Sequence, residues 1–254
     1  MLSEALLNLS PVAALALLAA FILGGSIKGA LGIGIPLVVV PLTAQFLELP
    51  AAVGLVTVPM FATNIGQALE SGGTLPALRR LWPMLIALVL GTLAGVHLLI
   101  SIDRRLLNGV VGTVLVGLAA WLFRQPRLGL SPSAERWAGP AVGLIAGTFG
   151  GLSGMFGPPL IAYLIGLGIH PDLFVKYISI LFLAATGALL LALGGSGTLS
   201  LTDLAISAAA MVPIQLGVVI GRWLRGRCPP SLFRALVLGV LACGGLDMLR
   251  RALF

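Results

Sequence analysis

The chain has 254 residues, of which 59% are hydrophobic and only 9% are charged, and its mean hydropathy is +1.12. A soluble domain carries about 25% charged residues, so this composition excludes a soluble protein and predicts a chain that crosses the membrane several times. The formal net charge is +7. In a membrane protein such an excess of Lys and Arg marks the cytoplasmic ends of helices, and we expect no nucleic-acid partner.

Ten apolar segments follow one another along the chain, and a hydrophilic linker, 124–137, lies between the fifth and the sixth. A membrane-spanning helix needs about 20 apolar residues. The second and seventh segments are shorter and, as helix, cover only about 18 Å, so both are predicted to be short helices that follow a break. The segments are 12–31, 36–47, 50–69, 81–101, 106–123, 138–157, 158–169, 173–193, 201–221 and 232–249.

The halves on either side of the linker share one order of elements: long, short, long, long, long. We therefore predict two repeats, 1–123 and 138–254, joined by the linker 124–137. A shift of 122 residues pairs Gly25 with Gly147, Gly29 with Gly151, Gly32 with Gly154 and Pro36 with Pro158, and a shift of 126 pairs Gly91 with Gly217 and Gly95 with Gly221.

The 15 Lys and Arg residues test how the two repeats are oriented. If all ten segments cross, the repeats are inverted, the linker is cytoplasmic, and eleven of these residues lie on the cytoplasmic side against four outside. If the short segments alone do not cross, the repeats are parallel and the count is about seven against eight. The positive-inside rule therefore favours inverted repeats. A re-entrant hairpin in place of each long–short pair gives the same parity, so the number of crossings stays open.

Each repeat contains one glycine-rich stretch that ends in proline, Gly24–Pro36 (GGSIKGALGIGIP) and Gly147–Pro159 (GTFGGLSGMFGPP). Interrupted helices at matching positions of two inverted repeats indicate the central site of a transporter. The N-termini of the short helices at Pro36 and Pro158 would direct N–H groups and positive dipole ends at that site, which suits an anion. The alternative for the same glycines is close helix packing of the small-xxx-small kind.

The candidate solute contacts combine the breaks with polar side chains inside the apolar segments. They are Lys28, Gly29, Gly32, Gly34, Pro36, Asn64, Gly151, Ser153, Gly154, Gly157, Pro158 and Gln215, and the candidates for coupling or gating are Lys176, Ser179, Asp247 and His97. Each polar candidate has a structural alternative. The lysines could extend to the membrane interface, Asp247 could pair with Arg250, three residues later, and Asn64, Gln215 and His97 could bond to neighbouring helices.

The sequence lacks the residue patterns of an intramembrane enzyme or a primary pump. It contains no HExxH motif, no paired intramembrane aspartates, no Cys–His pair and no nucleotide-binding loop. We therefore expect neither catalysis nor a metal or other cofactor.

The stretches GGSIKGALGIGIP and GTFGGLSGMFGPP, in a chain of two similar halves, resemble the TauE/SafE (sulfite exporter) family. The resemblance covers nearly the whole chain. It implies a multi-pass carrier in the bacterial inner membrane for small anions, notably sulfite, sulfonates and related organosulfur compounds, with the direction of transport left open. The two stretches are not symmetric in this sequence, because Lys28 has Gly150 as its counterpart and Ser153 has Leu31.

Together these observations predict an all-α polytopic protein of two inverted repeats, each with a broken first helix pair followed by three transmembrane helices. The predicted function is secondary transport by alternating access, with the solute between the two breaks. The expected partners are a small anion, the lipid bilayer, a coupling ion (proton or sodium) and a second copy of the chain. An anion channel, or a membrane anchor or assembly factor without a solute, is the alternative.

Overall fold

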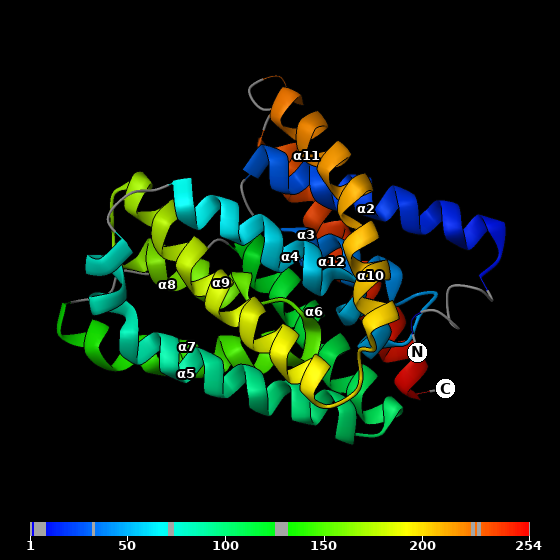
Figure 1. Ribbon diagram of the computed structural model, residues 1–254, viewed down its shortest axis with the longest axis horizontal. Helices are drawn as coiled ribbons and strands as arrows, with labels where there is room; N and C mark the ends of the chain where they lie inside the picture. The colour runs from blue at the N-terminus through cyan, green and yellow to red at the C-terminus, as the bar shows by residue number, and fades with distance from the viewer. Residues whose placement is uncertain are drawn as a thin grey trace. The chain divides into compact units, whose positions relative to one another are not determined.

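The computed structural model describes residues 2, 9–31, 34–70, 74–124, 132–224, 227 and 230–253. Every secondary-structure element assigned in these ranges is an α-helix, which confirms the predicted all-α class. The helices labelled in Figure 1 are α2 (Pro11–Leu31), α3 (Ile35–Thr43), α4 (Leu49–Glu70), α5 (Thr74–Ser101), α6 (Arg104–Arg124), α7 (Pro132–Ser153), α8 (Gly157–Gly166), α9 (Pro171–Gly195), α10 (Leu201–Ala209), α11 (Met211–Leu224) and α12 (Pro230–Leu253).

Each apolar segment of the sequence corresponds to one helix, except for the ninth, 201–221, which contains two. Helix α10 ends at Ala209 and α11 begins at Met211. Pro213 explains this interruption, because its ring nitrogen cannot donate a hydrogen bond to the Ala209 carbonyl four residues earlier. The predicted sixth segment, 138–157, also extends past the end of its helix, since α7 ends at Ser153.

Four stretches among the described residues are long and apolar enough to cross a membrane, and they establish the chain as a membrane protein. They are Pro11–Ala30, Leu78–Ser101, Lys176–Gly195 and Leu201–Leu224. The two predicted short helices are also present, because α3 has 9 residues and α8 has 10. At about 1.5 Å per residue, each covers roughly half of a hydrocarbon core about 30 Å thick.

The chain folds as two compact units. Unit 1 comprises Met1–Pro59, Ser101–Gln125 and Gly197–Phe254, and unit 2 comprises Met60–Ile100 and Pro126–Ser196. Each unit combines helices of both predicted repeats, so the units do not coincide with the repeats. The repeat boundaries at 1–123 and 138–254 describe a duplication in the sequence and stay a prediction.

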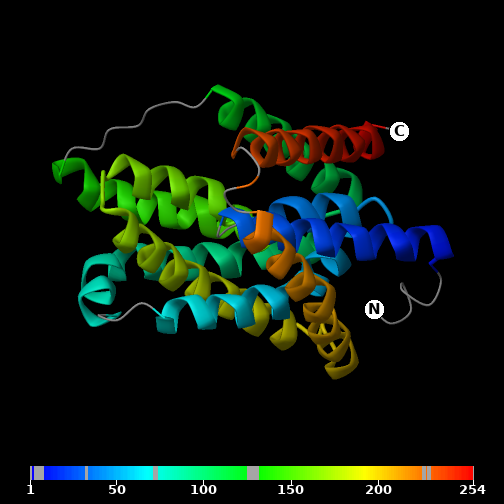
Figure 2. The same ribbon diagram turned by 90° about the horizontal axis from the view of Figure 1, so that it is seen from above.

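In unit 1, helix α2 packs against α11 with glycine on both sides of the contact, and α6 packs along α12 (Figure 2). The glycines lie so close to the opposite backbone that a Cβ atom would overlap it. A Cβ on Gly25 would meet the Ile214 carbonyl oxygen, one on Gly29 that of Val218, one on Gly217 that of Ile22, and one on Gly221 that of Ser26. This α2–α11 crossing is therefore a contact of backbone on backbone.

Unit 2 contains a crossing of the same kind between α5 and α7. A Cβ on Gly91 would meet the Leu144 carbonyl oxygen, one on Gly95 that of Thr148, one on Gly147 that of Leu88, and one on Gly151 that of Thr92. Small residues at both surfaces let the helices approach without any side chain between them. Most glycines of the two glycine-rich stretches are thus helical, and the breaks are narrower than the stretches.

Substitution of one crossing glycine tests this packing. We expect Gly217→Ala to destabilise the protein by about 1–3 kcal/mol, the usual cost of overpacking, because the new methyl group overlaps the Ile22 carbonyl oxygen. Gly239→Ala is the matched control, since Gly239 is also helical and a Cβ added to it would have no atom within 4 Å. Thermal unfolding of the purified protein in detergent would measure both; equal melting temperatures would contradict the crossing.

Candidate functional site: the two helix breaks

The break between α7 and α8 is built on Gly154 and Ser153. Gly154 has a φ of 76°, a left-handed conformation that glycine adopts without steric cost. Its N–H donates to the Gly150 carbonyl over 2.6 Å, which is the C-terminal cap of a helix that ends in this conformation. The Ser153 hydroxyl donates to the Phe149 carbonyl (2.7 Å) and accepts from the Met155 N–H (3.3 Å). Ser153 therefore satisfies backbone groups on both sides of the break.

Phe156 fixes the direction in which the chain leaves this break. Its side chain is fully buried, and its ring lies so close to Gly150 that a Cβ there would overlap it. Helix α8 then begins at Gly157, where a Cβ would contact Phe182 of α9 at 3.5 Å. The start of α8 is thus held between α7 and α9.

The break between α2 and α3 has the same components. Helix α3 begins at Ile35 directly after Gly34, whose φ is 119°, and Pro36 lies in its first turn. The short helix packs against α2, since a Cβ on Gly24 would lie 2.5 Å from Val39 Cγ2. Gly32, the predicted counterpart of Gly154, lies outside the described residues.

The two short helices begin without a side-chain cap. The first N–H groups of a helix have no acceptor within it and carry the positive end of its dipole, equivalent to about half a charge. Proline lowers the number of these donors. Helix α8 has two prolines in its first turn, Pro158 and Pro159, whereas α3 has only Pro36, so the first turn of α3 contains more backbone N–H groups.

The two candidate lysines are buried inside the protein. Lys28 lies in the last turn of α2 and is 8% exposed, and Lys176 lies in the second turn of α9 and is 7% exposed. A lysine that extended to the membrane interface would leave its ammonium group exposed, so the burial favours an internal role. Ser26, two residues before Lys28, donates its hydroxyl hydrogen to the Ile22 carbonyl over 2.8 Å.

Unit 2 brings together several of the predicted polar residues. Helix α9 packs against α7 and α8, and Phe61 of α4 contacts the position of a Gly187 Cβ at 3.3 Å. The helices that carry Asn64, Ser153 and Ser179 are therefore neighbours, and all three side chains are buried. Buried polar side chains in membrane helices mark solute pathways more often than lipid contacts.

Other predicted residues lie apart from the breaks. Gln215 of α11 and His97 of α5 are exposed. Asp247 of α12 forms ion pairs with Arg250 (2.9 Å) and Arg251 (2.7 Å), which confirms the local pairing that the spacing of three residues predicted. Gly29 and Gly151 lie in the α2–α11 and α5–α7 crossings, where neighbouring backbone covers them.

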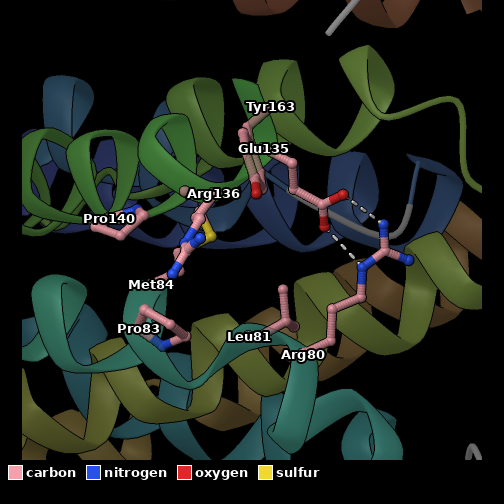
Figure 3. Close-up of a pocket in the computed structure, with 9 residues that line it drawn as sticks. Arg80, Leu81, Pro83, Met84, Glu135, Arg136, Pro140 and Tyr163 are labelled. Atoms are coloured by element: carbon pink, nitrogen blue, oxygen red, sulfur yellow. Dashed lines mark hydrogen bonds and ion pairs between the residues drawn. The ribbon is translucent and has the colours of Figure 1, made fainter. Parts of the chain in front are cut away.

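Unit 2 contains a charged cluster that was not predicted from the sequence (Figure 3). The Arg80 guanidinium donates to both carboxylate oxygens of Glu135, at 2.7 and 2.9 Å, and lies 5.8 Å from the ring centroid of Tyr177. In the sequence, Arg80 contributed only to the count of positive charges on the cytoplasmic side. Its partner lies 55 residues away in the predicted linker 124–137, whose last six residues form the start of α7, so no local spacing connects the two.

A second missed contact joins α10 to α4 in unit 1. The Ser207 hydroxyl donates to the carbonyls of Gly54 (3.0 Å) and Leu55 (2.9 Å). Its oxygen accepts a hydrogen bond from the Val58 N–H. In the sequence, Ser207 differs little from the other polar residues of α10, Thr202 and Asp203, so no local signal identifies it. Because Ser207 is fully buried, this interhelical bond is an internal one.

Comparison with known proteins identifies the family. No curated protein and no solved structure matches the chain. The family described as sulfite exporter TauE/SafE matches residues 16–248, a range that includes both helix breaks and both glycine crossings. The members of this family are membrane transporters of the sulfite exporter type. The chain belongs to the sulfite exporter TauE/SafE family.

Proposed function

We propose that this protein is a secondary carrier that moves small anions, namely sulfite, sulfonates or related organosulfur anions, across the bacterial inner membrane by alternating access. The observation that carries the proposal is the pair of helix breaks. Each contains a glycine of positive φ, Gly154 directly after α7 and Gly34 directly before α3. In each, the short helix that follows has proline in its first turn and no side-chain cap. Such broken helices present their N-terminal dipoles to anionic groups of a solute.

We propose different roles for the candidate residues. We assign solute contact to the backbone at Gly34, Gly154 and Gly157, and charge compensation to Lys28. We assign Ser153 a positioning role, because its hydroxyl hydrogen is donated to the Phe149 carbonyl and its oxygen receives the Met155 N–H. The anion would then be bound mainly by backbone N–H groups, which recognise charge without strong selection among oxyanions.

Inverted repeats are part of the proposal, and the glycine crossings support them. The shift of 122 residues pairs Gly25 and Gly29 with Gly147 and Gly151. The shift of 126 pairs Leu88 and Thr92, whose carbonyls contact Gly147 and Gly151, with Ile214 and Val218, whose carbonyls contact Gly25 and Gly29. The α2–α11 crossing and the α7–α5 crossing therefore join equivalent positions of the two repeats. Two independent crossings would have no reason to use matching positions on both helices.

Contacts between helix ends also support inversion. Arg80 contacts Tyr177, and Arg251 donates to the carbonyls of Ala44 and Gln45, at 3.0 and 2.9 Å. In the inverted arrangement each of these contacts joins residues on one side of the membrane. In the parallel arrangement each would join residues on opposite sides, which a bilayer about 30 Å thick forbids.

A flux assay distinguishes the carrier from its alternatives. Purified protein in liposomes should take up ³⁵S-labelled sulfite. Unlabelled sulfite loaded inside should accelerate that uptake several-fold, because the binding site of a carrier turns back to the outside faster when an anion occupies it. An anion channel would show uptake without acceleration, and an anchor or assembly factor would show no uptake above empty liposomes. Either of these two results would overturn the proposal, and imposed proton or sodium gradients would identify the coupling ion.

The Gly154 break predicts a specific loss of transport. Gly154→Ala should lower the sulfite flux at least tenfold, because a side chain disfavours the left-handed backbone by about 1–2 kcal/mol and so shifts the break that presents the α8 N-terminus. Gly168→Ala is the matched control, since Gly168 has a φ of 61° in the α8–α9 turn and open space around it. Both variants should lose similar thermal stability. Equal flux in the two variants would refute the role of the break.

A further inference from the structure

A pocket of about 240 Å³ lies at one end of unit 2, apart from the break residues. It is a partly open pocket between α5, α7 and α8, and its polar lining consists of Arg80, Glu135, Arg136 and Tyr163 (Figure 3). Gly139, Met84 and two prolines supply most of the remaining surface. Its volume lies below the range of about 300–1,000 Å³ that drug-sized ligands need, so it suits an occupant of a few heavy atoms.

The pocket carries a net positive charge. Arg80 and Glu135 neutralise each other through their two hydrogen bonds, and Arg80 also lies over the ring of Tyr177. Arg136 forms no ion pair with any of the described residues. The charge of Arg136, which is itself exposed, therefore remains at the pocket without a carboxylate partner among the described residues.

Tyr163 presents a hydrogen-bond donor to the same space. The residue is only 4% exposed, and no hydrogen bond joins its hydroxyl to another of the described residues. In Figure 3 this hydroxyl points into the pocket, between Arg136 and Glu135. Gly139 makes room for it, because a Cβ there would lie 2.9 Å from the hydroxyl oxygen. Because every fully buried side-chain oxygen or nitrogen of the described residues has a hydrogen-bond partner, this hydroxyl is open to the pocket, where it can donate to an occupant that accepts a hydrogen bond.

We propose that this pocket is a second oxyanion site, in which Arg136 and the Tyr163 hydroxyl bind the anion and the Arg80–Glu135 pair forms the wall. A guanidinium donates charge-assisted bonds to two oxygens of a sulfite, sulfonate or phosphate group, and the phenol supplies a third donor. The exposed Trp137, 79% exposed beside Arg136, is typical of the membrane interface. The oxyanion can therefore come from solution or from a lipid headgroup. Binding at this site does not depend on whether the protein transports the anion.

The two tyrosines of the chain, Tyr163 and Tyr177, allow a local test. Protein labelled with 3-fluorotyrosine gives two ¹⁹F signals, and the Tyr163→Phe variant assigns them. Titration with sulfite, ethanesulfonate or phosphate should shift the Tyr163 signal saturably. Arg136→Gln should weaken this binding about tenfold or more, the effect of losing one charge-assisted pair. Arg79→Gln is the matched control, because Arg79 is exposed on the same helix turn as Arg80 but does not line the pocket.

The source of the oxyanion is decided in nanodiscs. A Tyr163 signal that moves when phosphatidylglycerol replaces phosphatidylcholine, and that sulfite then moves no further, would assign the site to a lipid phosphate and support the proposal. A Tyr163 signal unmoved by all three anions and by phosphatidylglycerol would overturn it. Equal binding in the wild type and in Arg136→Gln, or an equal loss in Arg79→Gln, would also overturn it. Sulfite flux is measured on the same variants, so that a failure of the second-site proposal can be distinguished from a failure of the transport proposal.

Discussion

Backbone polar groups inside a bilayer must find partners within the protein, because no water is present to satisfy them, and this constraint governs the whole structure. A helix can therefore be interrupted at membrane depth only where the chain itself caps the exposed groups. The α7–α8 break does so with the Gly154 N–H and the Ser153 hydroxyl. The first N–H groups of α3 and α8 have no acceptor within their own helices and no side-chain cap, and in the proposed transport an anion is their acceptor.

Glycine has two separate roles in this chain. At Gly34 and Gly154 it permits a positive φ, which ends one helix and begins the next in a new direction. At Gly25, Gly147 and their partners it removes side chains from helix crossings so that backbones touch. The crossings hold α2 against α11 and α7 against α5 through backbone contacts. Each of these two packed helices ends in a break, and the break sets the direction of the short helix that follows it.

The sequence predicts the helices well because their signals are local. Apolar runs locate the helices, and proline after glycine marks the short helices that begin at Ile35 and Gly157. Gly29 and Gly151 were harder to assign, because a glycine in a helix crossing and one in a helix break look alike in a single sequence. Pro213 was a visible signal for the interruption between α10 and α11, and its effect was overlooked.

Long-range pairs were beyond sequence reasoning. Arg80, Glu135 and Tyr163 lie on three different helices, so their common pocket depends on the packing of α5, α7 and α8. Burial likewise needed the structure: Gln215 and Lys176 both lie in apolar segments, but only Lys176 is buried. The partner of a charged residue and the face on which a polar residue lies are set by tertiary packing, which one sequence does not encode in any local pattern.

The most direct test of the central claim, that the chain consists of two inverted repeats, is the side of the membrane on which its loops lie. Cys228 and Cys243 are first replaced by serine, and single cysteines are then introduced by Trp137→Cys and Ser196→Cys, both at exposed positions. A membrane-impermeant maleimide added to intact cells should label the cysteine at 196 and should reach the one at 137 only after permeabilisation. Labelling of both from the same side would show parallel repeats and contradict the account.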